Sequence, residues 1–256
     1  MSVIPSFDLS DKVAIVTGGS RGIGRTVVQG LAEAGADVVI ASRKVDACER
    51  AAAEVRATTG RRALAVGCHV ADWGQCDDLV ERVYSEFGRC DVLVNNAGMS
   101  PLYDSLTDIT EQYYDKVQGV NLKGPFRLAV SIGARMAAQS GGSIINVGTI
   151  GSLRPGSRDI VYACAKAGLN ALTIAIAEGY GPTVRSNAIL PGSVLTDIAE
   201  SWDDEMRESV TRNIPLGRIG TPADFVGTAL WLASDASRYV TGVMVRVDGG
   251  AYRQMS

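Results

Sequence analysis

The sequence is poor in histidine, because His69 is the only one among 256 residues. We therefore expect neither a Ser-His-Asp triad nor a multi-histidine metal centre. Acid–base chemistry, if this protein performs any, must use other side chains.

Cysteine is also scarce, with five residues, an odd number, and none in CxxC spacing. This pattern argues against a disulfide framework or a zinc site, and we expect reduced, structural thiols. No metal site is predicted.

Excess positive charge and long apolar runs are missing as well. The formal net charge is −3, which argues against a nucleic-acid partner. No uniformly apolar run reaches the roughly 18 residues of a membrane span, and the first residues, MSVIPSFDLSDK, do not resemble a signal peptide. We expect a cytoplasmic protein with no membrane contact.

Short apolar runs alternate with helical patterns along the whole chain. Strands are predicted at 12–17, 37–41, 63–68, 91–96, 143–148, 184–190 and 243–247, with helices at 25–34, 44–58, 73–87, 108–139, 159–180 and 222–234. Continuous apolar strands separated by helices indicate a parallel sheet covered on both faces. The predicted fold class is α/β: one Rossmann-like, doubly wound domain over 1–256 with about seven strands.

A glycine-rich turn, TGGSRGIG, follows the first predicted strand. Its spacing is Gly18-xxx-Gly22-x-Gly24 rather than GxGxxG. Such a turn can be purely structural, but backbone N–H groups at a helix N-terminus attract phosphate. Its place after the first strand of a parallel sheet favours nucleotide binding.

The end of the second strand distinguishes between two cofactors. It reads Ala41-Ser42-Arg43-Lys44, with no acid before Asp46. An acid there would bind the ribose of NAD, whereas cations accommodate the 2′-phosphate of NADP. These charges can also be solvated surface groups. We predict NADP(H), with NAD(H) less favoured, and expect Arg21 to assist.

Tyr162 and Lys166 stand four residues apart in a predicted helix. Residues at this spacing share one helix face, and a nearby cation favours the phenolate. Tyr162 could then transfer a proton near neutral pH. In isolation, the pair is better explained as part of an amphipathic helix surface.

Five motifs in order give the sequence a resemblance to the short-chain dehydrogenase/reductase family. They are the glycine spacing, NNAG at 95–98, Asn121, Tyr162-xxx-Lys166 and Pro191-Gly192. The resemblance implies that Tyr162 is the acid/base and that Lys166 lowers its pKa. It also implies a homotetramer that packs through the 108–139 helix and the Tyr162 helix.

The resemblance also assigns candidate site residues. Candidates for catalysis are Asn121, Thr149, Tyr162 and Lys166. Candidates for cofactor binding are Gly18, Ser20, Arg21, Gly22, Ile23, Gly24, Ser42, Arg43, His69, Val70, Asn96, Ala97, Gly98, Tyr162, Lys166, Pro191, Gly192, Val194 and Thr196.

Two positions depart from the family pattern. Thr149 stands where the family usually has serine; its hydroxyl can still donate, with Ser152 as the second choice. His69 stands where the family often has an aspartate, and a contact with adenine and a structural role are equally plausible there.

Asn121 lies four residues before Pro125 in the predicted 108–139 helix. Proline has no N–H, so we expect a kink and a free Asn121 carbonyl that binds water. A plain helix break is the alternative.

The predicted function is NADP(H)-dependent interconversion of a carbonyl and a secondary alcohol on a fairly apolar small molecule. Alternatives are a 3-ketoacyl-carrier-protein reductase and a catalytically silent NADP-binding regulator.

A substrate lid is expected at about 193–218. Residues 196–212 hold six acids and two arginines, which disfavours an acidic carrier protein. Trp202, Met206 and Val210 are spaced for one helical face.

Overall fold

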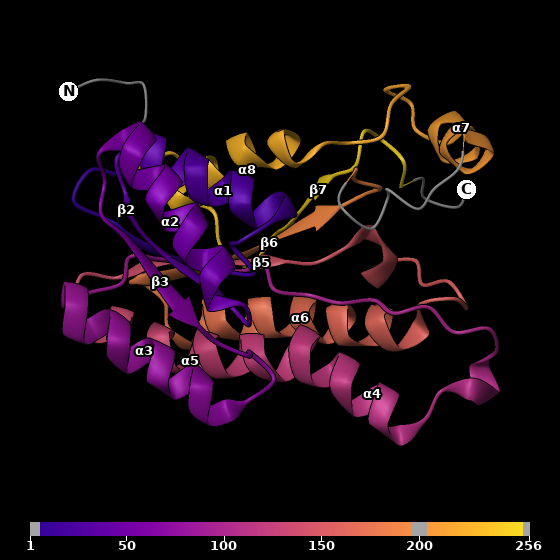
Figure 1. Ribbon diagram of the computed structural model, residues 1–256, viewed down its shortest axis with the longest axis horizontal. Helices are drawn as coiled ribbons and strands as arrows, with labels where there is room; N and C mark the ends of the chain where they lie inside the picture. Colours follow the sequence, from indigo (N-terminus) through magenta and orange to yellow (C-terminus); the bar gives the residue numbers. More distant parts are fainter. Residues whose placement is uncertain (1–5, 196–203, 253–256) are drawn as a thin grey trace.

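A seven-stranded, wholly parallel sheet forms the centre of the molecule (Figure 1). The computed structural model describes residues 6–195 and 204–252. The strands are β1 (Val13–Thr17), β2 (Asp37–Ser42), β3 (Ala63–Gly67), β4 (Val92–Asn95), β5 (Gly142–Val147), β6 (Val184–Pro191) and β7 (Met244–Val247), in the order β3-β2-β1-β4-β5-β6-β7. The predicted α/β, doubly wound fold is confirmed.

Alternate residues of each strand enter two separate cores. In β1, Ala14 and Val16 face the helices α1 (Gly22–Glu33), α2 (Val45–Thr59) and α8 (Val226–Ala233). Val13 and Ile15 face α3 (Trp73–Phe87), α5 (Gly124–Ala138) and α6 (Ile160–Gly179). Helices cover both faces of the sheet and exclude water from them. This explains why the strands read as unbroken apolar runs rather than alternating ones.

The predicted helix at 108–139 is instead a series of shorter elements. A 3₁₀ turn (Leu106–Asp108) precedes α4 (Glu111–Gln118), and a π-helical turn (Gly119–Lys123) joins α4 to α5. Pro125 lies in the first turn of α5. Proline has no N–H, so a carbonyl of the preceding turn lacks its usual donor. The backbone there forms a wider, π-helical turn.

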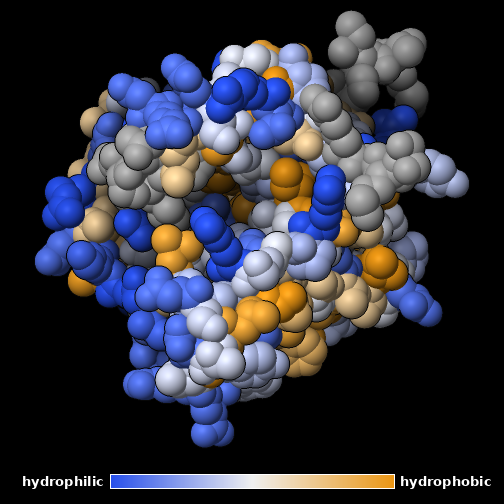
Figure 2. All heavy atoms as spheres, turned by 90° about the vertical axis from the view of Figure 1, so that its right-hand side faces the viewer, coloured by the Kyte–Doolittle hydropathy of each residue, from blue (hydrophilic) through white to orange (hydrophobic). Residues whose placement is uncertain are grey.

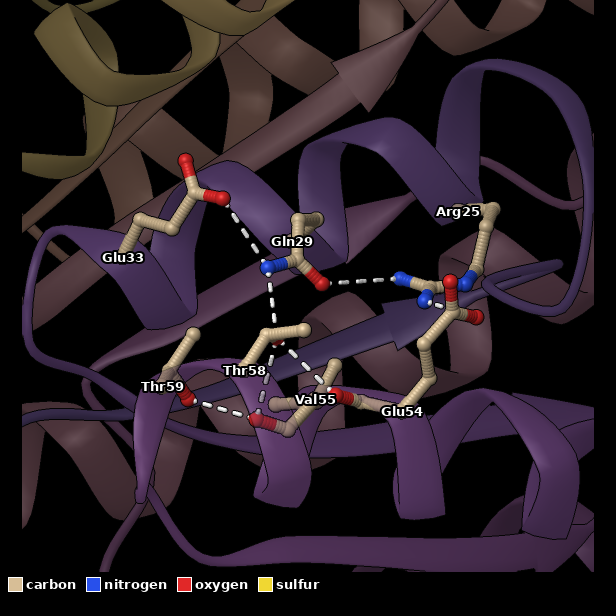
Figure 3. A network of polar contacts seen from close by, with 7 residues as sticks. All are labelled: Arg25, Gln29, Glu33, Glu54, Val55, Thr58 and Thr59. Carbon is tan, nitrogen blue, oxygen red and sulfur yellow. Dashed lines mark hydrogen bonds and ion pairs between the residues drawn. The ribbon is translucent and has the colours of Figure 1, made fainter.

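A polar network ties α1 to α2 (Figure 3). Arg25 pairs with Glu54 at 2.6 Å, and Gln29 donates to Glu33 at 2.9 Å and to Thr58 at 3.0 Å. These two helices follow the glycine turn and the end of β2. The network therefore holds those two turns in a fixed relation.

One helix among the described residues, α6, is long and apolar enough by composition to cross a membrane. It is not a uniformly apolar run, because Lys166, Asn170 and Thr173 interrupt it, all three buried. Half of its most apolar window is buried against the rest of the fold, as in the core helix of a globular domain.

Candidate active site

The candidate residues gather at the carboxyl ends of the strands. The strand order reverses between β1 and β4, where an α/β sheet opens a crevice for ligands. In Figure 1 the arrowheads of β6 and β7 point to this edge, and α7 (Asp204–Arg212) stands beside it. Figure 2 views it directly: the surface is hollowed near its centre, with apolar side chains inside and hydrophilic ones around the rim.

The glycine turn packs too tightly for any side chain at two positions. A Cβ on Gly24 would lie 2.3 Å from Asn96 Nδ2 and 2.4 Å from the Gly18 oxygen. Gly18 itself has φ +64° and lies against Ala97, while Gly22 has φ +53°. The turn is thus pressed onto the NNAG segment, and Ile23 packs into the core beneath it.

The helices that begin at this corner lack the usual caps. Arg21 is the N-cap of α1 and Lys44 that of α2, and neither side chain caps its helix. The first turn of α1 contains no acid. Since N–H groups and the helix dipole favour negative charge there, two basic N-caps fit an anionic ligand. Arg43 is exposed next to Lys44.

Thr17 joins the first strand to the NNAG segment, and the sequence analysis missed it. Its Oγ1 accepts the N–H groups of Asn96 at 3.0 Å and Ala97 at 3.1 Å, and Asn96 Nδ2 donates to the Thr17 carbonyl at 2.9 Å. These bonds fix the two edges of the crevice. The only sequence signal was a hydroxyl residue at the end of the first strand.

Tyr162 and Lys166 lie on one face of α6, as predicted. Lys166 Nζ is 5.7 Å from the centroid of the Tyr162 ring and donates to the Val147 carbonyl at 2.7 Å. Lys166 is 2% exposed. Gly98 faces it, since a Cβ there would lie 3.7 Å from Nζ and 3.1 Å from Asn121 Oδ1.

The pKa values of Tyr162 and Lys166 differ from the expectation. Burial lowers the pKa of Lys166 to about 7. Burial, with a smaller contribution from the Asp159 carboxylate, raises the pKa of Tyr162 to about 12. The expected lowering of the Tyr162 pKa by Lys166 is therefore not found, because loss of water raises this pKa and the Lys166 amine is bonded to the Val147 carbonyl.

Asn121 is fully buried in the π turn. Its side chain bridges two segments: Nδ2 donates to the carbonyls of Met99 at 2.8 Å and Val117 at 2.9 Å, and Oδ1 accepts from Met99 N–H at 3.2 Å. The side chain thus fixes the segment after NNAG. The predicted kink takes the form of this π turn.

Thr149 follows β5 and is the N-cap of a short 3₁₀ turn, Ile150–Ser152. Its Oγ1 accepts the N–H of Gly151 at 3.1 Å, which leaves the hydroxyl proton available. Ser152 is already engaged, donating to the Thr149 carbonyl at 2.6 Å and accepting from Asn170 at 2.9 Å. The geometry therefore favours Thr149 over Ser152 as the donor to a substrate.

The sequence analysis missed two further residues, Tyr103 and Asp159, which lie near the start of α6. The Tyr103 hydroxyl donates to the Ser157 carbonyl at 2.6 Å and accepts from Ile160 N–H at 2.9 Å, at the start of α6. The Asp159 carboxylate does not cap α6 and instead lies close to Gly151. An acid three residues before Tyr162 was the available signal.

His69 and Val70 follow β3. His69 Nδ1 accepts the N–H of Ala71 at 3.2 Å, and the Val70 carbonyl accepts from the Cys76 thiol at 3.3 Å. His69 therefore has a structural bond through Nδ1, while its Nε2 remains available to a ligand. The geometry of His69 is compatible both with a structural role and with a contact to adenine.

The segment after β6 closes the other side of the site. Pro191 is buried, and a Cβ on Gly192 would lie 2.8 Å from Asp248 Cβ. Val194 forms a parallel bridge with Gly220. Thr196 and Trp202 lie outside the described residues. Within the ranges 6–195 and 204–252, no three His, Cys, Asp or Glu residues gather as a metal site would require.

Comparisons with known proteins agree with this geometry. A family model described as Enoyl-(Acyl carrier protein) reductase matches residues 18–252. An L-rhamnose 1-dehydrogenase (NAD(P)(+)) from Azotobacter vinelandii is 43% identical over 95% of this chain and 98% of its own. A 3-oxoacyl-[acyl-carrier-protein] reductase from Staphylococcus aureus is 38% identical over 94% of this chain and 98% of its own.

A similar architecture exists among solved structures. A candidate NAD(P)-dependent gluconate 5-dehydrogenase from Beutenbergia cavernae, with NADP bound at low occupancy, superimposes with a TM-score of 0.91. It is 36% identical and covers 96% of this chain and 98% of its own. The chain belongs to the short-chain dehydrogenase/reductase family. It is an oxidoreductase enzyme of the class that interconverts alcohol and carbonyl groups.

Proposed function

We propose that the protein is an NADP(H)-dependent oxidoreductase that interconverts a carbonyl and a secondary alcohol on a small neutral molecule, with Tyr162 as general acid/base. The observation that carries this proposal is the placement of Tyr162 and buried Lys166 on one face of α6, with Lys166 bonded to the end of β5, which Thr149 follows. The site offers two hydroxyls and an amine, which suit a reacting oxygen and its proton.

The roles follow from which atoms are free. Thr149 Oγ1 and the Tyr162 hydroxyl would hold the substrate oxygen, and Tyr162 would give or take its proton. Lys166, in its protonated form, would stabilise the phenolate. The bound dinucleotide supplies or accepts the hydride.

Several features fit a dinucleotide along the crevice. The glycine turn and the uncapped first turn of α1 would take the pyrophosphate, and Asn96, Ala97 and Gly98 would line the middle. Gly98 brings the backbone against Lys166 and Asn121. Pro191, Gly192, Val194 and Thr196 would contact the nicotinamide end.

The preference for NADP rests on Ser42, Arg43 and Arg21. A 2′-phosphate would receive charge-assisted hydrogen bonds, each worth about 1.5–3 kcal/mol, so NADP should bind roughly 10²-fold more tightly than NAD. Titration with both cofactors is the direct test. The variant Ser42→Asp with Arg43→Leu should reverse the order, because a carboxylate binds the NAD ribose and repels phosphate. Equal affinities in the parent chain would refute the preference.

We propose a neutral hydroxylated substrate, and L-rhamnose is the first compound to test. The relative from Azotobacter vinelandii is named for that sugar. L-Rhamnose has no charge, which accords with the expected neutral molecule, but its hydroxyl groups make it far more polar than the fairly apolar substrate that the sequence predicted. A lid at about 193–218 remains a proposal, supported by α7, which lies on the side of the molecule toward which β6 points (Figure 1), and by exposed Met206.

A 3-ketoacyl-carrier-protein reductase is the second candidate, because the Staphylococcus aureus relative has that activity in its name. Assays should compare L-rhamnose and other aldoses with NADP against a 3-ketoacyl thioester with NADPH. Faster turnover of the thioester would overturn the proposed substrate class. If no carbonyl or alcohol is turned over, the remaining hypothesis is a catalytically silent NADP-binding regulator.

Tyr162→Phe tests whether the Tyr162 hydroxyl is the acid in the reaction. The substitution removes a proton donor and little volume, so cofactor binding should remain while most turnover is lost. A variant that keeps within about tenfold of the parent kcat would show that Tyr162 is not the acid.

We further propose a homotetramer in the cytoplasm. Residues of α4, the π turn, α5 and α6 line a shallow apolar groove, among them Leu122, Phe126 and Leu172, and Phe126 is 43% exposed. A second copy would cover this face. A monomer by light scattering at micromolar concentration would refute the assembly. Five free thiols, four of them buried, accord with a reducing compartment.

A further inference from the structure

A chain of three small polar side chains connects the glycine turn to the interior of the α1–α2 face. Ser20 Oγ lies 3.0 Å from Ser42 Oγ, and Ser42 Oγ lies 3.0 Å from Cys48 Sγ. Ser20 belongs to the turn between β1 and α1, Ser42 ends β2, and Cys48 lies in the first turn of α2. Three segments therefore meet at one hydroxyl.

Cys48, at the inner end of this series of side chains, is shielded from solvent. Cys48 is 0% exposed and belongs to the apolar cluster that includes Val28, Ile40 and Ala52. Burial raises the pKa of its thiol above the usual value. The sulfur thus stays protonated and keeps a donor to give to Ser42 Oγ.

Either partner could donate in each of these two bonds, and one assignment sends a proton outward. A hydroxyl has one proton, and when its oxygen accepts from a neighbour the proton points elsewhere. If Cys48 donates to Ser42, the Ser42 proton turns away from the core, toward Ser20 and the corner where exposed Arg43 stands. A phosphate, which at this corner accepts hydrogen bonds, requires protons that point outward.

We propose that Cys48 is a positioning residue for cofactor selection: its thiol donates to Ser42, so that the hydrogen-bonded pair of Ser42 and Ser20 keeps one hydroxyl proton for the 2′-phosphate of NADP. The inference rests on the proposed use of NADP(H). Cys48 would touch no cofactor atom and would act through Ser42. Its effect should therefore appear in the ratio of NADP to NAD affinity rather than in overall binding.

The test measures dissociation constants of NADP and NAD by calorimetry, without turnover. Cys48→Ala should lower the preference for NADP by about three- to tenfold, as expected for one neutral hydrogen bond. Cys48→Ser keeps a donor and should retain the preference. Cys48→Val removes the donor at similar volume, and it replaces Cys48→Ala should the smaller side chain leave a cavity that prevents folding.

Two controls separate orientation from general loosening. Cys90→Ala removes another buried thiol, at the start of β4, and should leave the ratio unchanged. Adding Cys48→Ala to Ser42→Ala should change the ratio no further than Ser42→Ala does alone, because the thiol acts through that hydroxyl.

The outcomes distinguish the two proposals. A parent chain with no preference for NADP refutes the proposed cofactor and, with it, any role for Cys48 in selecting it. A parent that prefers NADP while Cys48→Ala and Cys48→Val retain the full ratio overturns this inference alone. Additive effects of Cys48→Ala and Ser42→Ala would also overturn it.

Discussion

Lys166 directs its ammonium group away from solvent and donates to the Val147 carbonyl at 2.7 Å, with Nζ 5.7 Å from the centroid of the Tyr162 ring. The amine is thus fixed to the end of β5. Burial disfavours the charged form of both side chains.

The buried amine predicts a pH-dependent stability. The pKa of Lys166 is about 7 in the folded chain against the ordinary 10.5, so the unfolded chain binds more protons between these values. The free energy of unfolding should therefore rise with pH from about 7 upward, by at most about 1.4 kcal/mol per pH unit from this group. Urea unfolding at pH 7, 8 and 9 measures the slope.

Lys166→Met should flatten this rise and stabilise the chain most at pH 7 and below. Lys116→Met is the control, because Lys116 is exposed and does not line the apolar groove, and it should run parallel to the parent. Parallel curves for Lys166→Met would show that its ammonium is charged and well compensated in the folded chain.

Asp159→Asn should change the pH profile of turnover. The Asp159 carboxylate adds to the burial that raises the pKa of Tyr162. Removing its charge should lower that pKa, and alcohol oxidation needs the phenolate in the proposed mechanism. The rising limb of log kcat/KM should move to lower pH. Asp104→Asn, an exposed acid, is the control, and a limb that stays in place would contradict the coupling.

Thr149 is expected to be replaceable by serine and not by valine. Serine keeps the hydroxyl, whereas valine has nearly the same shape without it. We expect Thr149→Val to lower kcat by about 10²-fold, as for loss of one oxyanion-hole donor. Unfolding and cofactor titrations of both variants check that the fold persists. Nearly full activity in Thr149→Val would remove the donor role.

Tyr103→Phe should loosen the loop that leads into α6. Its hydroxyl makes two bonds, to the Ser157 carbonyl and from the Ile160 N–H. Their loss should cost about 1–3 kcal/mol of unfolding free energy and raise KM more than it lowers kcat. Tyr239→Phe is the matched control, since Tyr239 is 100% exposed. Equal behaviour of the two variants would refute the positioning role.

Gly24→Ala tests the packing of the glycine turn. The added Cβ would lie 2.3 Å from Asn96 Nδ2, so the turn must move and both cofactors should bind more weakly. Overpacking of this kind costs about 1–3 kcal/mol. Gly179→Ala, with no atom within 4 Å of its Cβ, should be neutral or slightly stabilising. Unchanged affinities in Gly24→Ala would mean that the turn adapts freely.

Local patterns in the sequence were enough to predict the sheet and most of its helices. Apolar runs bounded by turns placed all seven strands within one or two residues, because burial on both faces leaves a continuous pattern that needs no knowledge of partners. The same local logic placed the glycine turn at a strand end and put Tyr162 and Lys166 on one helix face, since their spacing is a property of the helix itself.

The charges of these residues and the contacts that hold them depend on the tertiary structure. The pKa directions of Tyr162 and Lys166 follow from how much water the fold removes, which no spacing reveals. Thr17, Tyr103 and Cys48 act through bonds to segments 6 to 80 residues away. The local effect of Pro125 was predicted as a kink or a break, and only the folded chain showed that it takes the form of a π turn. Hydrogen bonding and desolvation across the fold, rather than local pattern, set the chemistry of this site.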